Sequence, residues 1–306
     1  MTPLAGIFTP IATPFRDDDT IDEAGLRHNV ARWMGTPLDG LVVLGSNGEA
    51  PQLDDEEADR VVDLVREGVP AGRPLIAGTG RESTRATIAA TRRAAAAGVD
   101  AVLVRTPSFF KPQMTGEVFV RHYAEVAEAS PVPVLLYNVS TYTGVNLLPE
   151  AVERLAGHAN IVGIKESGGD IGQIAELLGR TPDGFTVLAG SATTFVHALC
   201  AGCHGGILAL ASLVPEAFVR MRALVAEGRL DAARALQRQL LPIARSVGSV
   251  HGVAGLKAAL DLIGYAGGPP RPPLRPVSAD TRELIRAQLA ALDVPLAHAE
   301  PALYTA

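Results

Sequence analysis

The stretch Ile161-Val162-Gly163-Ile164-Lys165 is a short apolar run that ends in a lysine. Similar runs recur along the chain, bounded by Gly, Pro or polar residues, and most lack strict alternation of apolar and polar residues. Parallel strands that are buried on both faces have this pattern. We therefore predict strands at residues 6–11, 41–44, 74–78, 101–104, 132–137, 161–165, 185–190 and 206–210.

The segments between these runs have helical periodicity. The first opens after residues 17–20, which can cap it, and the second begins with acidic residues that suit a helix N-terminus. Eight such β-then-α units over about 225 residues fit a closed (β/α)₈ TIM barrel better than an open doubly wound sheet. The predicted helices are 21–34, 54–67, 83–97, 116–129, 148–155, 171–178, 193–201 and 214–225.

Three further helices are predicted beyond the eighth unit, at residues 231–246, 253–263 and 279–292. A Gly/Pro-rich connection, 264–276, separates the last two. We therefore divide the chain into a catalytic barrel, 1–226, and a C-terminal helical extension, 227–306, packed on the barrel or on a neighbouring subunit.

The composition excludes several classes of protein. The 306 residues carry a net charge of −6 and no basic stripe, which argues against nucleic acid as a partner. Apolar stretches stay below the roughly 20 residues that span a bilayer, and the N-terminal residues lack a secretory pattern. Two cysteines make no disulfide framework, so we expect a cytoplasmic protein without membrane partners.

In a barrel, functional groups lie where the strands end and the following loops begin. Lys165 ends an apolar strand and is one of three lysines in the chain, with Lys111 and Lys257. Desolvation disfavours an ammonium ion, and the neutral amine is the nucleophile that attacks a ketone. Lys165 is therefore the candidate Schiff-base residue; the alternative is a lysine whose amine reaches solvent or pairs with Glu166.

Two other strand ends carry polar groups. The turn Gly45-Ser46-Asn47-Gly48-Glu49 offers N–H groups and side chains that can hold a carboxylate, although an ordinary βα turn has the same composition. Tyr137 can supply a phenol for proton transfer, or it can be a half-buried strand end. A nucleophilic lysine, a phenol and an anion-binding turn together make a consistent active site.

A haem-attachment pattern is matched by Cys200-Ala201-Gly202-Cys203-His204. Together with His197, the same residues could also be interpreted as zinc ligands. This pattern follows the seventh predicted helix, however, on the barrel face associated with stability rather than function. We therefore predict no metal and no cofactor, since a lysine imine is itself the electron sink of such an enzyme. The chain also lacks the G-x-S-x-G elbow of a hydrolase.

In combination, these motifs resemble the dihydrodipicolinate synthase / N-acetylneuraminate lyase family over nearly the whole chain. The resemblance implies a barrel with a helical extension, a pyruvate Schiff base on Lys165, Tyr137 as the proton-transfer phenol, and Ser46 and Asn47 at the substrate carboxylate. The resemblance also implies a homo-oligomer, either a homotetramer or a homodimer. The matching stretches are Thr13-Pro14-Phe15, Gly45 to Glu49, Ala77-Gly78-Thr79-Gly80, Thr106-Pro107, Tyr137-Asn138-Val139, Gly163-Ile164-Lys165-Glu166 and Ala189-Gly190-Ser191.

Two departures bear on the branch of that family. Tyr142 stands where the synthase branch has an arginine for its second substrate, which argues against synthase activity. Phe109 stands where family members have a tyrosine that reaches across a subunit interface to complete a proton relay, and phenylalanine carries no proton. The Gly-Ser-Asn-Gly-Glu turn and the Gly255-Leu256-Lys257 stretch are most similar to the 4-hydroxy-2-oxoglutarate aldolase branch.

The leading hypothesis is thus a class I carbon–carbon lyase that cleaves a 4-hydroxy-2-oxo acid, such as 4-hydroxy-2-oxoglutarate, to pyruvate and an aldehyde. We place Gly48, Ser167, Gly190 and Ile207 in the substrate site, with Ser167 and the N–H groups near Gly168-Gly169 as candidates for a second carboxylate. The alternatives are a 2-keto-3-deoxy sugar acid aldolase or dehydratase, a dihydrodipicolinate synthase-like condensation, and a non-catalytic 2-oxo-acid-binding protein.

Overall fold

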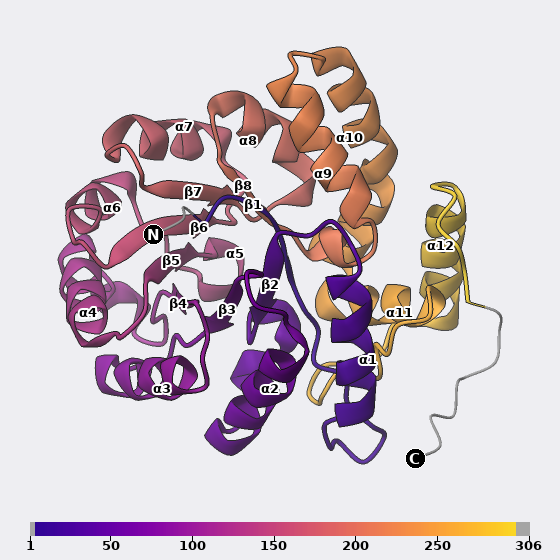
Figure 1. Cartoon of the computed structure of the whole chain (residues 1–306), viewed down its shortest axis with the longest axis horizontal. Helices are drawn as coiled ribbons and strands as arrows, with labels where there is room; N and C mark the ends of the chain where they lie inside the picture. The colour runs from indigo at the N-terminus through magenta and orange to yellow at the C-terminus, as the bar shows by residue number, and fades with distance from the viewer. Residues whose placement is uncertain (1–3, 298–306) are drawn as a thin grey trace.

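The structure, a computed structural model, describes residues 4–297. The first three residues of the predicted barrel segment, 1–3, and the last residues of the predicted extension, 298–306, lie outside the described residues. Within the described range, parallel strands pair in chain order and β1 pairs with β8, so the sheet closes (Figure 1). This confirms the predicted (β/α)₈ barrel. The strands are β1 (Gly6–Pro10), β2 (Gly40–Val43), β3 (Leu75–Gly78), β4 (Ala101–Arg105), β5 (Val134–Asn138), β6 (Ile161–Glu166), β7 (Thr186–Ala189) and β8 (Gly205–Ile207).

Helices surround the strands, and the helices that follow β8 lie along one side of the barrel next to α1 (Figure 1). The barrel helices are α1 (Glu23–Met34), α2 (Asp55–Gly68), α3 (Thr84–Ala96), α4 (Gly116–Ala129), α5 (Ser140–Thr143), α6 (Pro149–Leu155), α7 (Ile171–Arg180), α8 (Phe195–Ala201) and α9 (Pro215–Ala226). The tail forms α10 (Leu230–Ala244), a π-helical turn η6 (Arg245–Val250), α11 (Gly252–Leu262) and α12 (Ala279–Ala290).

The predicted strands are all found, with ends that differ by at most three residues. The largest difference is at β8, predicted at 206–210 but formed by Gly205–Ile207. A Cβ on Gly205 would lie 1.9 Å from the carbonyl oxygen of Gly6, so β8 can begin there only with glycine. After Ile207 the chain turns into a 3₁₀ helix, Ala209–Ser212, which ends the pairing.

Side-chain caps fix where several helices begin. Asp54 and Glu57 form a reciprocal capping box at α2, and Ser83 caps α3. The prediction that residues 17–20 cap the first helix was wrong. Asp22 accepts the hydrogen bond from the N–H of Gly25 instead, because the chain first makes a tight turn that pairs Phe15 with Ile21.

Two apolar cores support the site. The larger one lies between the strands and the helices, and the smaller one fills the barrel interior. Its upper members, Tyr137 and Ile207, lie at the carboxyl ends of their strands, so the interior core ends where the functional groups begin. The interior residues are Phe8, Val42, Ile76, Ala101, Leu103, Leu135, Tyr137, Val139, Leu188 and Ile207.

The tail helices are found close to their predicted positions, but two features were not predicted. The chain after β5 forms the short helix α5, and α10 continues into the π-helical turn η6 instead of ending at residue 246. Both features line the site described below. Across residues 4–297, the helices are all too short or too polar to span a membrane.

Candidate active site

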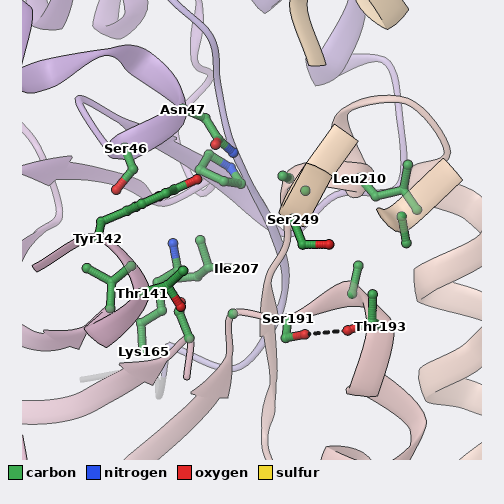
Figure 2. Close-up of a pocket in the computed structure, with 18 of the residues that line it drawn as sticks. Ser46, Asn47, Thr141, Tyr142, Lys165, Ser191, Thr193, Ile207, Leu210 and Ser249 are labelled. Atoms are coloured by element: carbon green, nitrogen blue, oxygen red, sulfur yellow. Dashed lines mark hydrogen bonds between the residues drawn. The ribbon is translucent and has the colours of Figure 1, made fainter. Parts of the chain in front are cut away.

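A cavity of about 180 Å³ opens at the carboxyl ends of the barrel strands (Figure 2). It is lined by residues from β1, β5, β6 and β8, from the segments that follow β2, β5, β6, β7 and β8, and from the tail. The sequence predicted seven of its members, namely Ser46, Asn47, Tyr137, Lys165, Ser167, Gly190 and Ile207. Side chains about 160 residues apart in sequence are therefore brought together by barrel closure, as the strand-end prediction requires.

Lys165 lies at the floor of this cavity with its amine directed into it (Figure 2). The residue is 4% exposed, and its Nζ lies 4.2 Å from the centre of the Tyr137 ring. Arg105, Tyr137 and Lys165 are register partners on β4, β5 and β6, so the three residues stand side by side. Parallel pairing thus places the phenol next to the amine.

The Tyr137 hydroxyl lies 3.3 Å from the Ser46 hydroxyl, which joins the strand-five phenol to the turn after β2. Ser46 and Asn47 belong to a 3₁₀ turn, Ser46–Gly48, and both line the cavity. Gly48 does not line it: its N–H donates to the carbonyl of Gly45, and its own carbonyl accepts from Thr13. The cavity wall at this turn is therefore formed by the two side chains that precede Gly48.

Ser167 and Gly190 meet at the opposite wall. The Ser167 hydroxyl is buried and has no hydrogen-bond partner among the described residues. A Cβ on Gly190 would lie 1.8 Å from that oxygen, so glycine at this position is what leaves room for the serine hydroxyl. The result is a hydroxyl without a partner on a residue that lines the cavity.

The N–H groups of Ser167 and Gly168 are already engaged. Gly168 N–H donates to Glu166 Oε1 at 2.6 Å, and Ser167 N–H donates to the carbonyl of Asn138. Glu166 points away from Lys165 and also accepts from Asn138 and Gln173. Burial raises the pKa of Glu166, and these hydrogen bonds counteract the rise. The carboxylate therefore fixes the β6–α7 loop and does not pair with Lys165.

Sequence reasoning missed the outer wall of the cavity. Thr141 and Tyr142 come from α5, and Tyr142 lies beside Ser46 and Asn47 above the lysine (Figure 2). Ser249 faces them from η6, and Ser191 and Thr193 are joined by a hydroxyl–hydroxyl contact of 2.9 Å. Two of these positions carried a signal: Ser191 directly follows a strand end, and Tyr142 stands where the synthase branch has an arginine for its second substrate. The contribution of η6 depends on tail packing, which no local pattern reports.

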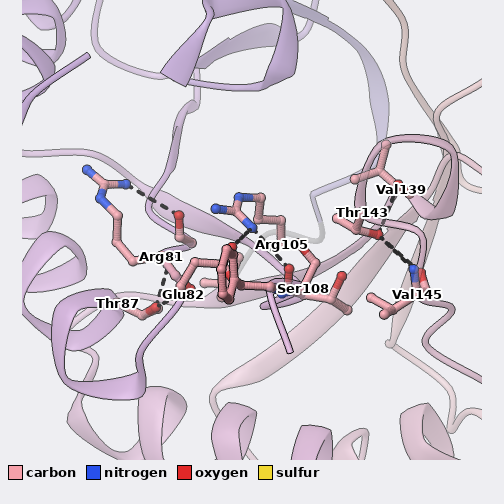
Figure 3. Close-up of polar contacts among 12 residues, drawn as sticks. Arg81, Glu82, Thr87, Arg105, Ser108, Val139, Thr143 and Val145 are labelled. Carbon is pink, nitrogen blue, oxygen red and sulfur yellow. Dashed lines mark hydrogen bonds and ion pairs between the residues drawn. The ribbon is translucent and has the colours of Figure 1, made fainter. Parts of the chain in front are cut away.

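The loop after β4 contains Phe109 and lies outside the cavity. Glu82 accepts the N–H groups of Ser108 and Phe109, and it pairs with Arg105 (Figure 3). Burial acts to raise the pKa of Glu82, but these three partners hold it below its usual value. The loop is thereby fixed with the rings of Phe109 and Phe110 exposed and packed edge to face, 5.1 Å apart.

A second, smaller cavity of about 30 Å³ lies behind the Tyr137 and Ser46 hydroxyls. Its other lining residues are Leu44, Gly45, Ala50, Pro51, Gly78, Gly80, Leu103 and Arg105. A volume of this size holds about one water molecule when polar groups line it. Tyr137 lines both cavities, and Ser46 and Arg105 also contribute polar groups to the smaller one.

The Cys200 to His204 motif spans the end of α8 and the turn before β8, away from the cavity. Cys200 is exposed and Cys203 is buried, and burial raises the pKa of Cys203 to about 12. His204 accepts a hydrogen bond from the N–H of Val187. Within residues 4–297, His, Cys, Asp and Glu side chains do not gather in threes or more as they would around a metal ion.

Comparisons with known proteins give a consistent result. A model of the dihydrodipicolinate synthetase family matches residues 3–292. A 4-hydroxy-tetrahydrodipicolinate synthase of Methanopyrus kandleri is 37% identical over 288 residues, which make up 94% of this chain and 95% of that protein. One of Xanthomonas axonopodis pv. citri is 39% identical over 276 residues, or 90% of each. The crystal structure of dihydrodipicolinate synthase from Thermotoga maritima superposes with a TM-score of 0.91 at 33% identity, covering 95% of this chain and 99% of that one.

Proposed function

The chain belongs to the dihydrodipicolinate synthetase family, and from that premise we propose that Lys165 forms a Schiff base with the ketone of a pyruvate-type 2-oxo acid. Members of this family are lyases and synthases of the class I aldolase type. The observation that carries the proposal is a single buried lysine amine directed into the strand-end cavity, 4.2 Å from the ring of a phenol. A lysine in such a place acts as a nucleophile towards carbonyl carbon.

The reaction we propose is retro-aldol cleavage of a 4-hydroxy-2-oxo acid such as 4-hydroxy-2-oxoglutarate. The Lys165 amine adds to C2, and Tyr137 protonates the hydroxyl that leaves as water, which gives an iminium ion. The Tyr137 phenolate then accepts the C4 hydroxyl proton while the C3–C4 bond breaks. An aldehyde departs, and the enamine takes a proton at C3 before water releases pyruvate.

Hydrogen-bond donors at both ends of the cavity suit a dicarboxylate. The Ser46 hydroxyl and the Asn47 amide are assigned to the C1 carboxylate, since both lie on the side of the lysine that holds Tyr137. The unmatched Ser167 hydroxyl is assigned to the second carboxylate. The N–H of Gly168 is not part of this assignment, because Glu166 already accepts it.

A water molecule in the smaller cavity would serve as the proton relay that Phe109 cannot provide. That cavity touches both Ser46 and Tyr137, and a water within it would lie one hydrogen bond from the phenol. The proton path would run from the Tyr137 and Ser46 hydroxyls through this water to the solvent side of Arg105.

A second candidate is the condensation catalysed by 4-hydroxy-tetrahydrodipicolinate synthases, favoured by the names of the similar proteins. The same pyruvate enamine would attack an aldehyde instead of releasing one. Tyr142 argues against it, because among the described lining residues Lys165 is the one basic side chain, and a second anionic substrate would lack a guanidinium.

Borohydride trapping with pyruvate, followed by intact mass and peptide mapping, tests the Schiff base. We expect one reduced adduct on Lys165 that is absent from Lys165→Ala. Lys111→Ala, a change at an exposed lysine outside the cavity, is the control and should retain the adduct. An adduct on another lysine, or none, would contradict the proposal and favour a 2-oxo-acid-binding protein if pyruvate still binds.

Turnover assays on the same enzyme separate the candidate reactions. Pyruvate release from 4-hydroxy-2-oxoglutarate supports the lyase, whereas consumption of pyruvate with aspartate semialdehyde supports the condensation. An intact carbon chain from a 2-keto-3-deoxy sugar acid would indicate a dehydratase. Tyr137→Phe should lower kcat by about 10²- to 10⁴-fold, the range for loss of a general acid–base group.

A further inference from the structure

A buried ion pair lies outside the cavity and has no part in the proposed reaction. Lys257 Nζ on α11 lies 2.5 Å from Glu49 Oε1, and each side chain is 1% exposed. Glu49 directly follows the turn that carries Ser46 and Asn47, while Lys257 comes from the C-terminal tail. α11 packs directly on this turn. The pair therefore connects two segments that are 208 positions apart.

The surroundings of the pair are built from tail residues. Lys257 Nζ also donates to the carbonyl of Pro269 at 2.8 Å, and Glu49 Oε2 accepts the backbone N–H of Arg271 at 2.8 Å. The Phe15 ring has Lys257 Nζ at 4.3 Å and the Arg271 guanidinium at 4.3 Å. Burial lowers the pKa of Lys257, and the Glu49 carboxylate counteracts that effect.

Stability alone does not account for such a pair. The desolvation of two buried charges offsets much of their attraction, so an apolar pair of similar volume is often as stable. The conformation of the adjacent turn supplies a different reason. Leu44 and Glu49 bracket the turn with φ values of 55° and 56°, in the left-handed region that non-glycine residues rarely adopt. Strained backbone of this kind persists only where the surrounding structure holds it.

We propose that Glu49 and Lys257 are positioning residues that hold the turn so that Ser46 and Asn47 face the Lys165 amine. The tail fixes the Glu49 side chain, Glu49 fixes the end of the turn, and the turn presents the two side chains to the cavity. The C-terminal segment thus completes the carboxylate site of the barrel. This inference rests on the proposed function, because it takes the ligand of the turn to be the carboxylate of a 2-oxo acid.

The test compares three variants of the full-length enzyme. Glu49→Gln removes the negative charge, and Glu49→Gln with Lys257→Met removes both charges. Glu49→Asp keeps the negative charge, but its shorter side chain places the carboxylate farther from the Lys257 amine. We expect KM for the 2-oxo acid to rise about tenfold in each, with kcat within about threefold, since a misplaced binding group of this kind weakens capture of the substrate. Trapping at saturating pyruvate should still label Lys165 fully.

An exposed ion pair provides the matched control. Glu117→Gln with Arg154→Met removes a pair that joins α4 to α6 at the surface, and KM should not change. Folded buried-pair variants with the KM of wild type would overturn the inference, as would a loss of kcat at constant KM. Glu49→Asp keeps the test decisive if the charge-removing variants do not fold. If the wild-type enzyme itself formed no pyruvate adduct on Lys165, that result would contradict the proposed function and not only this inference.

Discussion

At the scale of single residues, burial decides which side chains can do chemistry. Lys165 and Lys257 are both almost fully buried, but only Lys165 faces a cavity, whereas Lys257 is held by Glu49 and Pro269. The sequence analysis chose Lys165 over Lys257 because a strand end in a barrel opens to the site and a helix interior does not. The structure adds a more specific reason, which is that the Lys257 amine is paired with the Glu49 carboxylate.

His122 provides a prediction at this scale. It lies on α4, is 4% exposed, and contacts the Thr84 hydroxyl through Nδ1 at 2.9 Å. Burial lowers the pKa of His122 to about 4, from an ordinary value of 6.5. As pH falls below about 6.5 the unfolded chain takes up a proton that the folded protein does not accept until about pH 4. The folded state should therefore lose about 3 kcal/mol over that interval from this residue.

Denaturant unfolding of wild type and His122→Asn at pH 7 and pH 4 measures this effect. The variant should lose about 3 kcal/mol less between the two pH values than wild type does. His197→Asn, at an exposed position on α8, is the control and should follow wild type. If His122→Asn and wild type lose stability in parallel, burial of this histidine is not a source of acid sensitivity.

At the scale of secondary-structure elements, local signals placed most of the barrel. Apolar runs predicted every strand because strands buried on both faces need no polar alternation. The predicted helices that start at residues 54 and 83 begin at residues that the structure shows to be caps, Asp54 and Ser83. The cap prediction failed at α1, where a turn separates residues 17–20 from the helix. The elements α5 and η6, which are short or irregular, were not predicted.

The capping box of α2 can be tested directly. Asp54 accepts the N–H of Glu57 at 2.8 Å, and Glu57 returns a hydrogen bond to the N–H of Asp54. Asp54→Ala should reduce the free energy of unfolding by about 1 kcal/mol, the usual cost of losing such a cap. Asp63→Ala, an exposed position within the same helix, should change stability by less than about 0.5 kcal/mol in the same urea titration. Equal losses of stability in Asp54→Ala and Asp63→Ala would contradict the assignment of Asp54 as the cap of α2.

At the scale of the whole molecule, barrel closure and tail packing create the site. Closure brings Ser46, Tyr137, Lys165 and Ser167 to one rim. The tail then supplies η6 as an outer wall and Lys257 as a support for the turn. The predicted division at residue 226 therefore separates segments that share one cavity.

Subunit assembly is the prediction at this scale. Family resemblance implies a homotetramer or homodimer, and Phe109 and Phe110 are 78% and 66% exposed on a loop fixed by Glu82. Light scattering should give a multiple of the chain mass. Phe109→Ser with Phe110→Ser should shift the protein towards the single chain, whereas Leu284→Ser, at an exposed site on α12, should not. A single-chain mass for wild type would refute the prediction.

The sequence by itself determined the barrel, the candidate lysine and phenol, and the family. These follow from strand burial, strand-end position and local motifs, each of which is encoded in a few consecutive residues. Tertiary structure alone decided that Gly48 lies behind the cavity wall, that Glu166 faces away from Lys165, and that η6 and Lys257 support the site. The physical reason is distance along the chain: these contacts join residues on different elements, from 28 positions apart at Asn138 and Glu166 to 208 at Glu49 and Lys257, so they depend on how whole elements pack and leave no periodic or local signal.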